Sequence, residues 1–372
     1  MSRLYLKNNS NIEHIKFSKT TQHAEFSNEL RSKVREYFTT HNTHRYANAN
    51  MVFKTIFMIS LFLIPLIVLC LGLVSSTPML FVMYMISGLG MTGIGMGVMH
   101  DALHGSYSTK TNINKWVGYS INLIGANASV WKIQHNVLHH TYTNIEDSDD
   151  DLNMPYFLRF SPNTKYYGIH KFQHIYVWFF YGLLTLIWVS IKDFIRIMRY
   201  HKLGFFKKRH EVKIELAKAV LLKVMYYGYS LIIPIIMLPI APWVIVVAFL
   251  SMHFMTGLFI SVVFQTAHIM TSNEFPNPDE HGMIDDDWSV HQLATTSNYA
   301  PKSRLLSWFI GGLNFQIEHH LLPNVCHVHY KKLSVIVSET ALKYDIPYHS
   351  QRTFVSAISD HFRMLRSLGQ VA

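Results

Sequence analysis

Four long apolar stretches, separated by polar segments, dominate the hydropathy pattern of this chain. They cover residues 51–74, 78–99, 219–240 and 243–267, with very short links inside the first and the second pair. Each stretch is long enough to cross the roughly 30 Å hydrocarbon layer of a membrane as a helix of about 20 residues. The pattern therefore predicts an all-α membrane protein with four transmembrane helices arranged in two hairpins.

Composition supports a multi-pass integral membrane protein. The chain has 372 residues, of which 49% are hydrophobic, and its mean hydropathy is +0.14. The formal charge is +10, and eight Lys/Arg fall between Lys192 and Lys213. Such a run is typical of the cytoplasmic side of a membrane protein, and it also suits contact with anionic membrane lipids. Nucleic-acid binding is not expected of a chain this apolar.

The two ends of the chain are polar. Residues 1–50 are mixed in charge and show no basic-then-apolar leader, so we expect a cytoplasmic N-terminal segment without a cleaved signal peptide. Residues 346–372 are expected to form a cytoplasmic C-terminal tail. The main domain is then 51–345.

Seven histidines gather in three clusters beside the apolar stretches. On a helix, residues four apart share a face, so each His-x-x-x-His pair can reach one metal ion. His140 is then turned by about 100° from His139 and suits a second metal. The seven residues are His100 and His104, then His135, His139 and His140, then His319 and His320.

The number and kind of these residues predict a dimetal site. One first-row ion takes four to six ligands, so seven or eight imidazoles are too many for one ion and suit two. The chain has only two cysteines, Cys70 and Cys326, which excludes a thiolate cluster. We expect the clusters to lie together in a helical cap on the cytoplasmic face.

Two shorter apolar stretches are expected not to cross the membrane. Stretch 116–131 holds many small and polar residues. For stretch 174–191, the number of membrane crossings gives the answer. The second and third histidine clusters lie on one side of the membrane only if an even number of crossings separates them, and stretches 219–240 and 243–267 already supply two. We therefore expect 116–131 and 174–191 to be interfacial, or buried against the helix bundle.

Several further residues are candidates for the same site. His268 ends the fourth apolar stretch and is expected to be an eighth ligand, and His291 is a weaker candidate. Because ligating histidines usually donate their second N–H to a carboxylate or carbonyl, polar residues inside the clusters can bind or orient the ligands. These residues are Gln316, Asp101, Asn136 and Glu318.

Two neighbouring groups are expected to play smaller parts. The acidic run Asp147, Asp149, Asp150 and Asp151 is expected to be a solvated turn or helix start, although one member could orient His139 or His140. His327 and His329 are expected to pack or to form hydrogen bonds.

The residues around the clusters resemble the membrane-bound fatty acid desaturases with three histidine boxes, and the glutamine that opens the third box resembles the front-end subgroup. The resemblance covers roughly residues 40–345. It is carried by His-Asp-Ala-Leu-His-Gly (100–105), Gln-His-Asn-Val-Leu-His-His-Thr-Tyr-Thr-Asn (134–144) and Gly-Gly-Leu-Asn-Phe-Gln-Ile-Glu-His-His-Leu-Leu-Pro (311–323).

This resemblance implies an oxidoreductase with a non-haem diiron centre, which uses O2 to introduce a cis double bond into an acyl chain carried by CoA, an acyl carrier protein or a phospholipid. Residues 1–50 lack the His-Pro-Gly-Gly motif of a fused cytochrome b5 domain. Electrons are therefore expected from a separate ferredoxin or cytochrome b5, as in bacterial members, which implies a bacterial inner membrane. Two alternatives stay open, a lipid, sterol or carotenoid hydroxylase of the same superfamily and a non-enzymatic zinc-binding receptor or transporter.

Overall fold

The computed structural model describes residues 15–18 and 20–370. The chain divides into two compact units. We call the first the apolar unit, which consists of Ala47–Ile133 and Trp178–Val262. We call the second the histidine unit, which consists of Met1–Tyr46, Gln134–Val177 and Val263–Ala372.

The apolar unit consists of helices. Its first part holds α2 (Ala49–Cys70), α3 (Thr77–Gly93), the π-helix η2 (Ile94–Val98), α4 (Met99–Leu103), α5 (Thr111–Gly118), α6 (Ser120–Leu123) and α7 (Ala128–Lys132). Its second part holds α9 (Leu184–Ile187), η5 (Trp188–Lys192), α10 (Asp193–Lys202), α11 (Arg209–Tyr227), η6 (Gly228–Ile232) and α12 (Ile233–Met237). Three helices continue from one unit into the other, namely η3 (Ile133–His139), α8 (Gln173–Gly182) and α13 (Pro242–His268).

In the described part of the chain, four helical segments are long and apolar enough to cross a membrane, by length and composition. A bent helix pair over 168–202 would make a fifth if it counted as one span. The four are Ala49–Cys70, Thr77–Leu103, Arg209–Met237 and Pro242–His268. Their number agrees with the four predicted stretches, although the third begins well before residue 219. Hydropathy locates only the apolar part of a helix, and the basic first turns of α11 extend beyond it.

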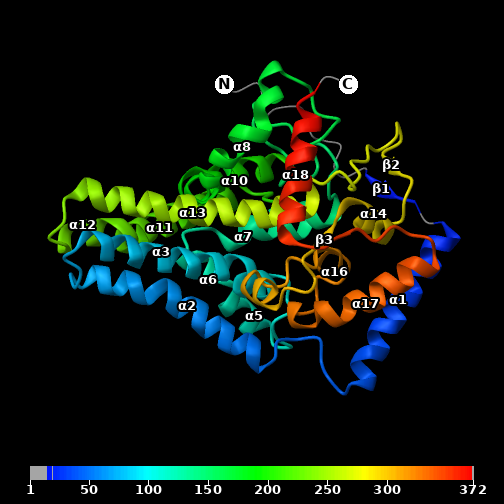
Figure 1. The fold of residues 1–372 in the computed structure, drawn as a ribbon, viewed down its shortest axis with the longest axis horizontal. Coiled ribbons are helices and arrows are strands. Elements are labelled where there is room, and N and C mark those ends of the chain that lie inside the picture. The colour runs from blue at the N-terminus through cyan, green and yellow to red at the C-terminus, as the bar shows by residue number, and fades with distance from the viewer. Residues whose placement is uncertain (1–14, 19, 371–372) are drawn as a thin grey trace. The chain divides into compact units, whose positions relative to one another are not determined.

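Close contact between α2 and α3, which lie side by side in Figure 1, depends on a glycine. A Cβ atom on Gly90 would lie 2.3 Å from the backbone nitrogen of Phe62, which no side chain could tolerate. One turn away, the Ser87 hydroxyl donates a hydrogen bond to the Phe62 carbonyl oxygen at 2.9 Å. The close packing of these two helices therefore requires glycine at this position.

A buried ion pair links three helices of the apolar unit. Lys223 of α11 pairs with Asp193 of α10, and its ammonium also donates to the Gly125 carbonyl oxygen at 2.8 Å. The backbone nitrogen of Asn127, which precedes α7, donates to the same Asp193 carboxylate at 3.1 Å. The short segments predicted as one interfacial stretch, 116–131, are thus three helices, with the last anchored to α10 and α11.

The histidine unit has its own apolar core, to which the N-terminal segment contributes. Helix α1 (Thr21–Thr40) places apolar residues at helical spacing against α17 (Tyr330–Lys343), and the two helices lie side by side in Figure 1. The α1 residues in this core are Phe26, Leu30, Val34 and Tyr37, and those of α17 include Leu333, Val337 and Ala341. Helix α1 was not foreseen within the polar segment 1–50.

The remaining elements of this unit are short, except for α18. They are β1 (Lys16–Phe17), η4 (Gly168–Phe172), β2 (Met283–Ile284), α14 (Trp288–Thr295), β3 (Asn298–Tyr299), α15 (Arg304–Phe309), α16 (Gln316–Leu321), η7 (His327–His329), β4 (Ser350–Gln351) and α18 (Phe354–Leu368). Strand β1 pairs with β2, and β3 with β4, both in parallel.

The predicted C-terminal tail contains helix α18, which is packed against the rest of the histidine unit. His361 is fully buried, and its Nδ1 lies 2.8 Å from the Ile269 carbonyl oxygen. The Asp360 carboxylate accepts hydrogen bonds from the backbone nitrogen and the hydroxyl of Thr271. Helix α18 therefore holds residues 269–271, which directly follow His268, in place.

Candidate metal centre

The second histidine cluster lies on a π-helix, not on an α-helix. Helix η3 closes its backbone hydrogen bonds five residues apart, so residues 135 and 140 come onto the same face. The Nε2 atoms of His135 and His140 are 3.3 Å apart. His140 therefore lies beside His135, and its expected part in a second metal site stays a prediction.

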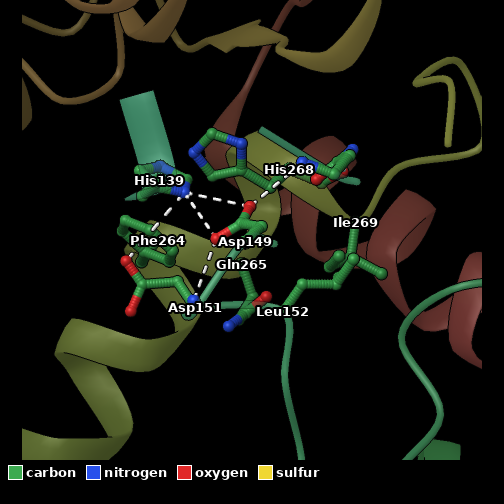
Figure 2. A pocket seen from close by; sticks show the side chains of 9 residues that line it. His139, Asp149, Asp151, Leu152, Phe264, Gln265, His268 and Ile269 are labelled. Atoms are coloured by element: carbon green, nitrogen blue, oxygen red, sulfur yellow. Dashed lines mark hydrogen bonds and ion pairs between the residues drawn. The ribbon is translucent and has the colours of Figure 1, made fainter. Parts of the chain in front are cut away.

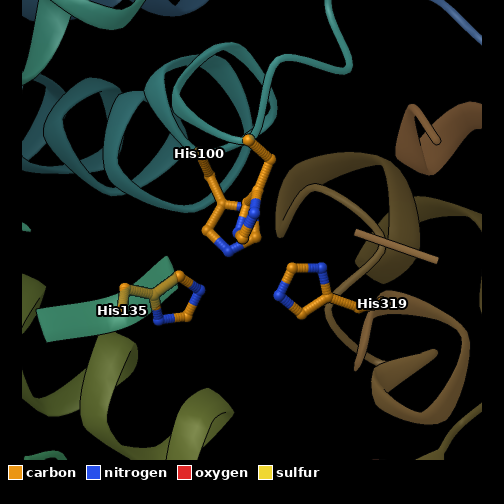
Figure 3. Close-up of side chains that lie close together, drawn as sticks. His100, His135 and His319 are labelled. Atoms are coloured by element: carbon orange, nitrogen blue, oxygen red, sulfur yellow. The ribbon is translucent and has the colours of Figure 1, made fainter. Parts of the chain in front are cut away.

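Histidines of the second and third clusters meet within the histidine unit. His140 Nε2 lies 3.0 Å from His319 Nε2. The rings of His135 and His319 face one another almost in parallel, with centroids 5.7 Å apart and an interplanar angle of 14° (Figure 3). Three imidazoles from two distant segments thus direct ring nitrogens to a common region.

A second group consists of His139, His268 and His320. Each can offer a ring nitrogen, and these atoms all lie within 4.8 Å of one another. The three residues come from η3, the end of α13 and α16, and all three are buried. The structure thus brings His268, predicted from its place after an apolar stretch, next to two box histidines.

The carboxylate of Asp149 fixes the ring of His139 (Figure 2). His139 Nδ1 lies 3.1 Å from both carboxylate oxygens, and Asp149 is 1% exposed. Burial lowers the pKa of His139, but the charge and hydrogen bond of Asp149 more than offset this, so the pKa is raised. The acidic run is therefore not a solvated turn at Asp149 and Asp150, both of which are buried. The other expectation, that one of its members orients His139, agrees with this contact.

His320 is held by residues from two other segments. Its Nδ1 lies 2.7 Å from the side-chain oxygen of Gln292 on α14, and the Thr143 hydroxyl lies 2.9 Å from the same oxygen. Burial and the neighbouring histidines lower the pKa of His320, which favours the neutral, metal-binding form. Neither Gln292 nor Thr143 was predicted, because nothing in their local sequence marks them.

The remaining polar residues of the third box have separate partners. The Gln316 side-chain nitrogen lies 3.0 Å from His268 Nε2. This contact places Gln316 beside His268, and whether Gln316 binds or orients a ligand stays a prediction. Glu318 faces away from the imidazoles, since its carboxylate accepts hydrogen bonds from the side-chain nitrogen of Asn298 at 2.8 Å and the Tyr348 hydroxyl at 2.9 Å. Burial raises the pKa of Glu318 to about 7, against the lowering effect of these two hydrogen bonds.

His291 lies outside both groups. It is buried with its ring beside Phe17, at 5.0 Å between centroids, and burial lowers its pKa to about 4. Helix α14 instead presents the next residue, Gln292, to His320. Asn136 is half-buried on η3, and its role stays a prediction. His329 packs as expected, with its ring 5.2 Å from that of Phe38.

The first histidine cluster belongs to the apolar unit. His100 lies on α4 and His104 caps its C-terminal end, and their ring centroids are 4.8 Å apart. Both rings contact Trp131 edge-on. Asp101 is buried, and its backbone oxygen accepts hydrogen bonds from Ser106. The pair therefore shares one side of the helix, as its spacing predicts.

Ring nitrogens of the histidine unit are suited to binding a metal ion. His139 Nε2, His268 Nδ1 and His320 Nε2 are buried and have no hydrogen-bond partner among residues 15–18 and 20–370. Burying a polar atom without a partner costs about 1–3 kcal/mol, so a metal ion bound to these residues would offset an unfavourable term. In two of these rings the other nitrogen is held by Asp149 or Gln292, the arrangement usual for metal-ligating histidines.

The sequence profile of the fatty acid desaturase family matches residues 75–352. The chain belongs to this family. It is 32% identical to the sn-1 linoleoyl-lipid 6-desaturase of Synechocystis sp. over 97% of this chain and 99% of that protein. It is 33% identical to the protein of the same name from Arthrospira platensis, over 76% of each chain. An acyl-lipid (8-3)-desaturase of Physcomitrium patens is 29% identical over 95% of this chain and 75% of that protein.

Family membership and the four apolar helices together identify an oxidoreductase of the membrane. The desaturase is a multi-pass membrane protein, and its relatives are desaturases of the front-end type. The expected family is thereby confirmed. Its histidine clusters are residues that could bind metal.

Proposed function

We propose that this desaturase introduces a cis double bond into a lipid-linked acyl chain at a centre of two irons. The observation that carries the proposal is the meeting of His139, His268 and His320, from three distant segments. Each has a buried ring nitrogen without a hydrogen-bond partner in the described part of the chain. The names of the relatives favour a lipid-linked acyl group over CoA or a carrier protein.

The ligand set we propose has two parts. His135, His139, His140, His268, His319 and His320 of the histidine unit would hold the irons, and His100 and His104 of the apolar unit would complete the set. The pairing of His100 with His104 on one side of α4 supports the second part. Asp149 would orient His139, and Gln316 would lie beside His268.

Abstraction of hydrogen from a methylene group needs an oxidant that side chains cannot supply, and two bound irons with O2 would supply it. The protein residues would hold, orient and dry the site. His319 and His320 are fully buried, so water is kept away from them. Asp149 and Gln292 each engage one ring nitrogen, which leaves the other nitrogen of the same ring to bind.

We propose that the site faces the cytoplasm of a bacterial inner membrane, that the spans form two hairpins, and that the site lies in a helical cap. We further propose that stretches 116–131 and 174–191 are interfacial. The basic run from Lys192 to Lys213 supports this orientation through the charge rule for cytoplasmic loops. Electrons would come from a separate ferredoxin or cytochrome b5.

The test is product analysis in a host that lacks its own desaturases and is supplied with linoleoyl lipid. Gas chromatography with mass spectrometry should show a fatty acid with one more double bond, whose position it also assigns. A hydroxylated product would favour the hydroxylase alternative. Absence of any new product, with the protein present in the membrane, would contradict the proposal.

A further inference from the structure

We propose that Gln292 is a positioning residue of the metal centre, whose side-chain oxygen fixes the tautomer of His320. The inference rests on the proposed metal centre and adds a residue to it. Gln292 lies outside the three histidine boxes, between the second and the third, on helix α14. Its effect would be exerted through His320, without direct contact with iron or substrate.

The contact itself assigns the proton on His320. Gln292 Oε1 lies 2.7 Å from His320 Nδ1, and an amide oxygen can only accept a hydrogen bond. His320 Nδ1 must therefore carry the hydrogen, and Nε2 keeps its lone pair. His320 Nε2 is the buried atom without a partner in the described part of the chain, and it is the nitrogen available to a metal.

The surroundings hold the Gln292 amide in this orientation. The side chain is 0% exposed, and its neighbours Val290 and Leu293 lie in the apolar core of the histidine unit. Asp287 caps the helix, because its carboxylate accepts a hydrogen bond from the Ser289 backbone nitrogen at 2.9 Å. The Thr143 hydroxyl lies 2.9 Å from the same Gln292 oxygen and 2.7 Å from the His139 carbonyl oxygen, so it lies between the two.

Rotation of the amide by half a turn would reverse the outcome. It would place an N–H group against His320 Nδ1 and force the hydrogen of the ring onto Nε2, where no metal could bind. In the present orientation Gln292 Nε2 has no hydrogen-bond partner among the described residues. A buried amide with an unpaired donor destabilises the fold, whereas a methionine would fill a similar volume without that loss. The acceptor offered to His320 explains why glutamine is found here.

The test compares three variants of the full-length chain in detergent. Gln292→Met removes the acceptor, Gln292→Glu keeps an acceptor, and Gln173→Met is the matched control. Gln173 is also a buried amide of the histidine unit, but it bonds to Arg159 and the Leu365 carbonyl oxygen, away from the histidine groups. Thermal unfolding shows which variants are folded, and competition with a chelator measures the affinity of each for ferrous iron without O2.

We expect Gln292→Met to weaken the affinity for ferrous iron by about 10- to 100-fold, the range found when a residue that orients a metal ligand is replaced. Gln173→Met should lose thermal stability but keep its affinity, and Gln292→Glu should bind iron about as tightly as the wild type. A folded Gln292→Met chain with unchanged affinity would overturn the inference.

If Gln292→Met does not fold, Gln292→Glu decides, because a loss of ten-fold or more there would overturn the inference too. The inference and the proposed function fail differently. A wild-type chain that binds no ferrous iron would remove the metal centre and this inference with it. Normal iron binding by the wild type, with no effect of Gln292→Met, would remove the inference alone.

Discussion

The two units of this desaturase differ in their content of long apolar helices and of candidate metal-binding histidines. In the apolar unit, Val224 of α11 is 64% exposed and Ile236 of α12 is 73% exposed. In the histidine unit, His319 and His320 are fully buried, together with Glu318. Long, continuous apolar helices suit contact with lipid, and buried imidazoles need polar partners or a metal ion. The difference suits a protein that meets lipid with its apolar helices and has histidine clusters that could bind metal.

The largest effect is expected from the loss of a buried imidazole. His319→Ala should leave the protein inserted in the membrane but abolish iron binding and desaturation, because His319 Nε2 lies 3.0 Å from His140 Nε2 in the cluster. Iron content and product analysis measure this. His170→Gln is the matched control, since His170 is equally buried but bonds to the Tyr156 carbonyl oxygen. Retention of two irons by His319→Ala would refute the ligand assignment.

The next effect tests the lipid-facing side of the comparison. Val224→Lys places a charge in the middle of the span Arg209–Met237 and should cost about 3 kcal/mol of insertion free energy. The measurement is the fraction of protein that stays in the membrane after alkaline extraction. Ile214→Lys is the control, because Ile214 is 49% exposed near the basic end of α11, where a lysine can reach water. Equal membrane fractions for the two variants would mean that Val224 does not face lipid.

A smaller effect is expected where a carboxylate orients a ligand. Asp149→Asn removes the charge beside His139 Nδ1 but keeps an oxygen, so iron affinity should fall by about ten-fold. Asp147→Asn serves as the control, since Asp147 is exposed in the same segment. Chelator competition measures both variants. The orienting role of Asp149 would be excluded by equal affinities.

The smallest effect concerns the support of the histidine unit. Glu29 of α1 binds Lys343 of α17 at 2.6 Å, and hydrogen bonds from Lys343, Lys33 and Tyr344 lower its pKa to about 2. Because the folded pKa lies below the ordinary value of 4.5, this contribution to stability is present above pH 4.5 and is lost as the pH falls toward 2. As the pH is lowered from 6 to 3, the thermal unfolding temperature should therefore fall more steeply for the wild type than for Glu29→Gln. Parallel curves would show that the α1–α17 contact does not depend on Glu29.

The sequence predicted the apolar spans and the histidine pairs better than the arrangement of the histidines. Hydropathy found the four spans, and spacing found the histidine pairs, because both signals are local. The place of His140 depended on the π-helical hydrogen bonding of η3, which α-helical periodicity does not reveal. Asp149 was noticed only because it follows the second box closely.

Contacts between distant segments could not be predicted from these local signals in the sequence. Gln292 lies 28 residues before His320, and only the fold brings the two within 2.7 Å. His291 drew attention as a histidine, yet α14 turns its neighbour toward the site. Helix α1 could have been found, since Phe26, Leu30, Val34 and Tyr37 recur at helical spacing within the polar N-terminal segment.

The most direct test of the central claim is the iron content of the purified full-length chain after loading with ferrous iron in the absence of O2. If the imidazoles of the boxes and His268 hold the centre, elemental analysis should find about two irons per chain, in line with the number of nitrogen donors. A chain that takes up zinc in place of iron, or that retains no iron at all, would contradict the account.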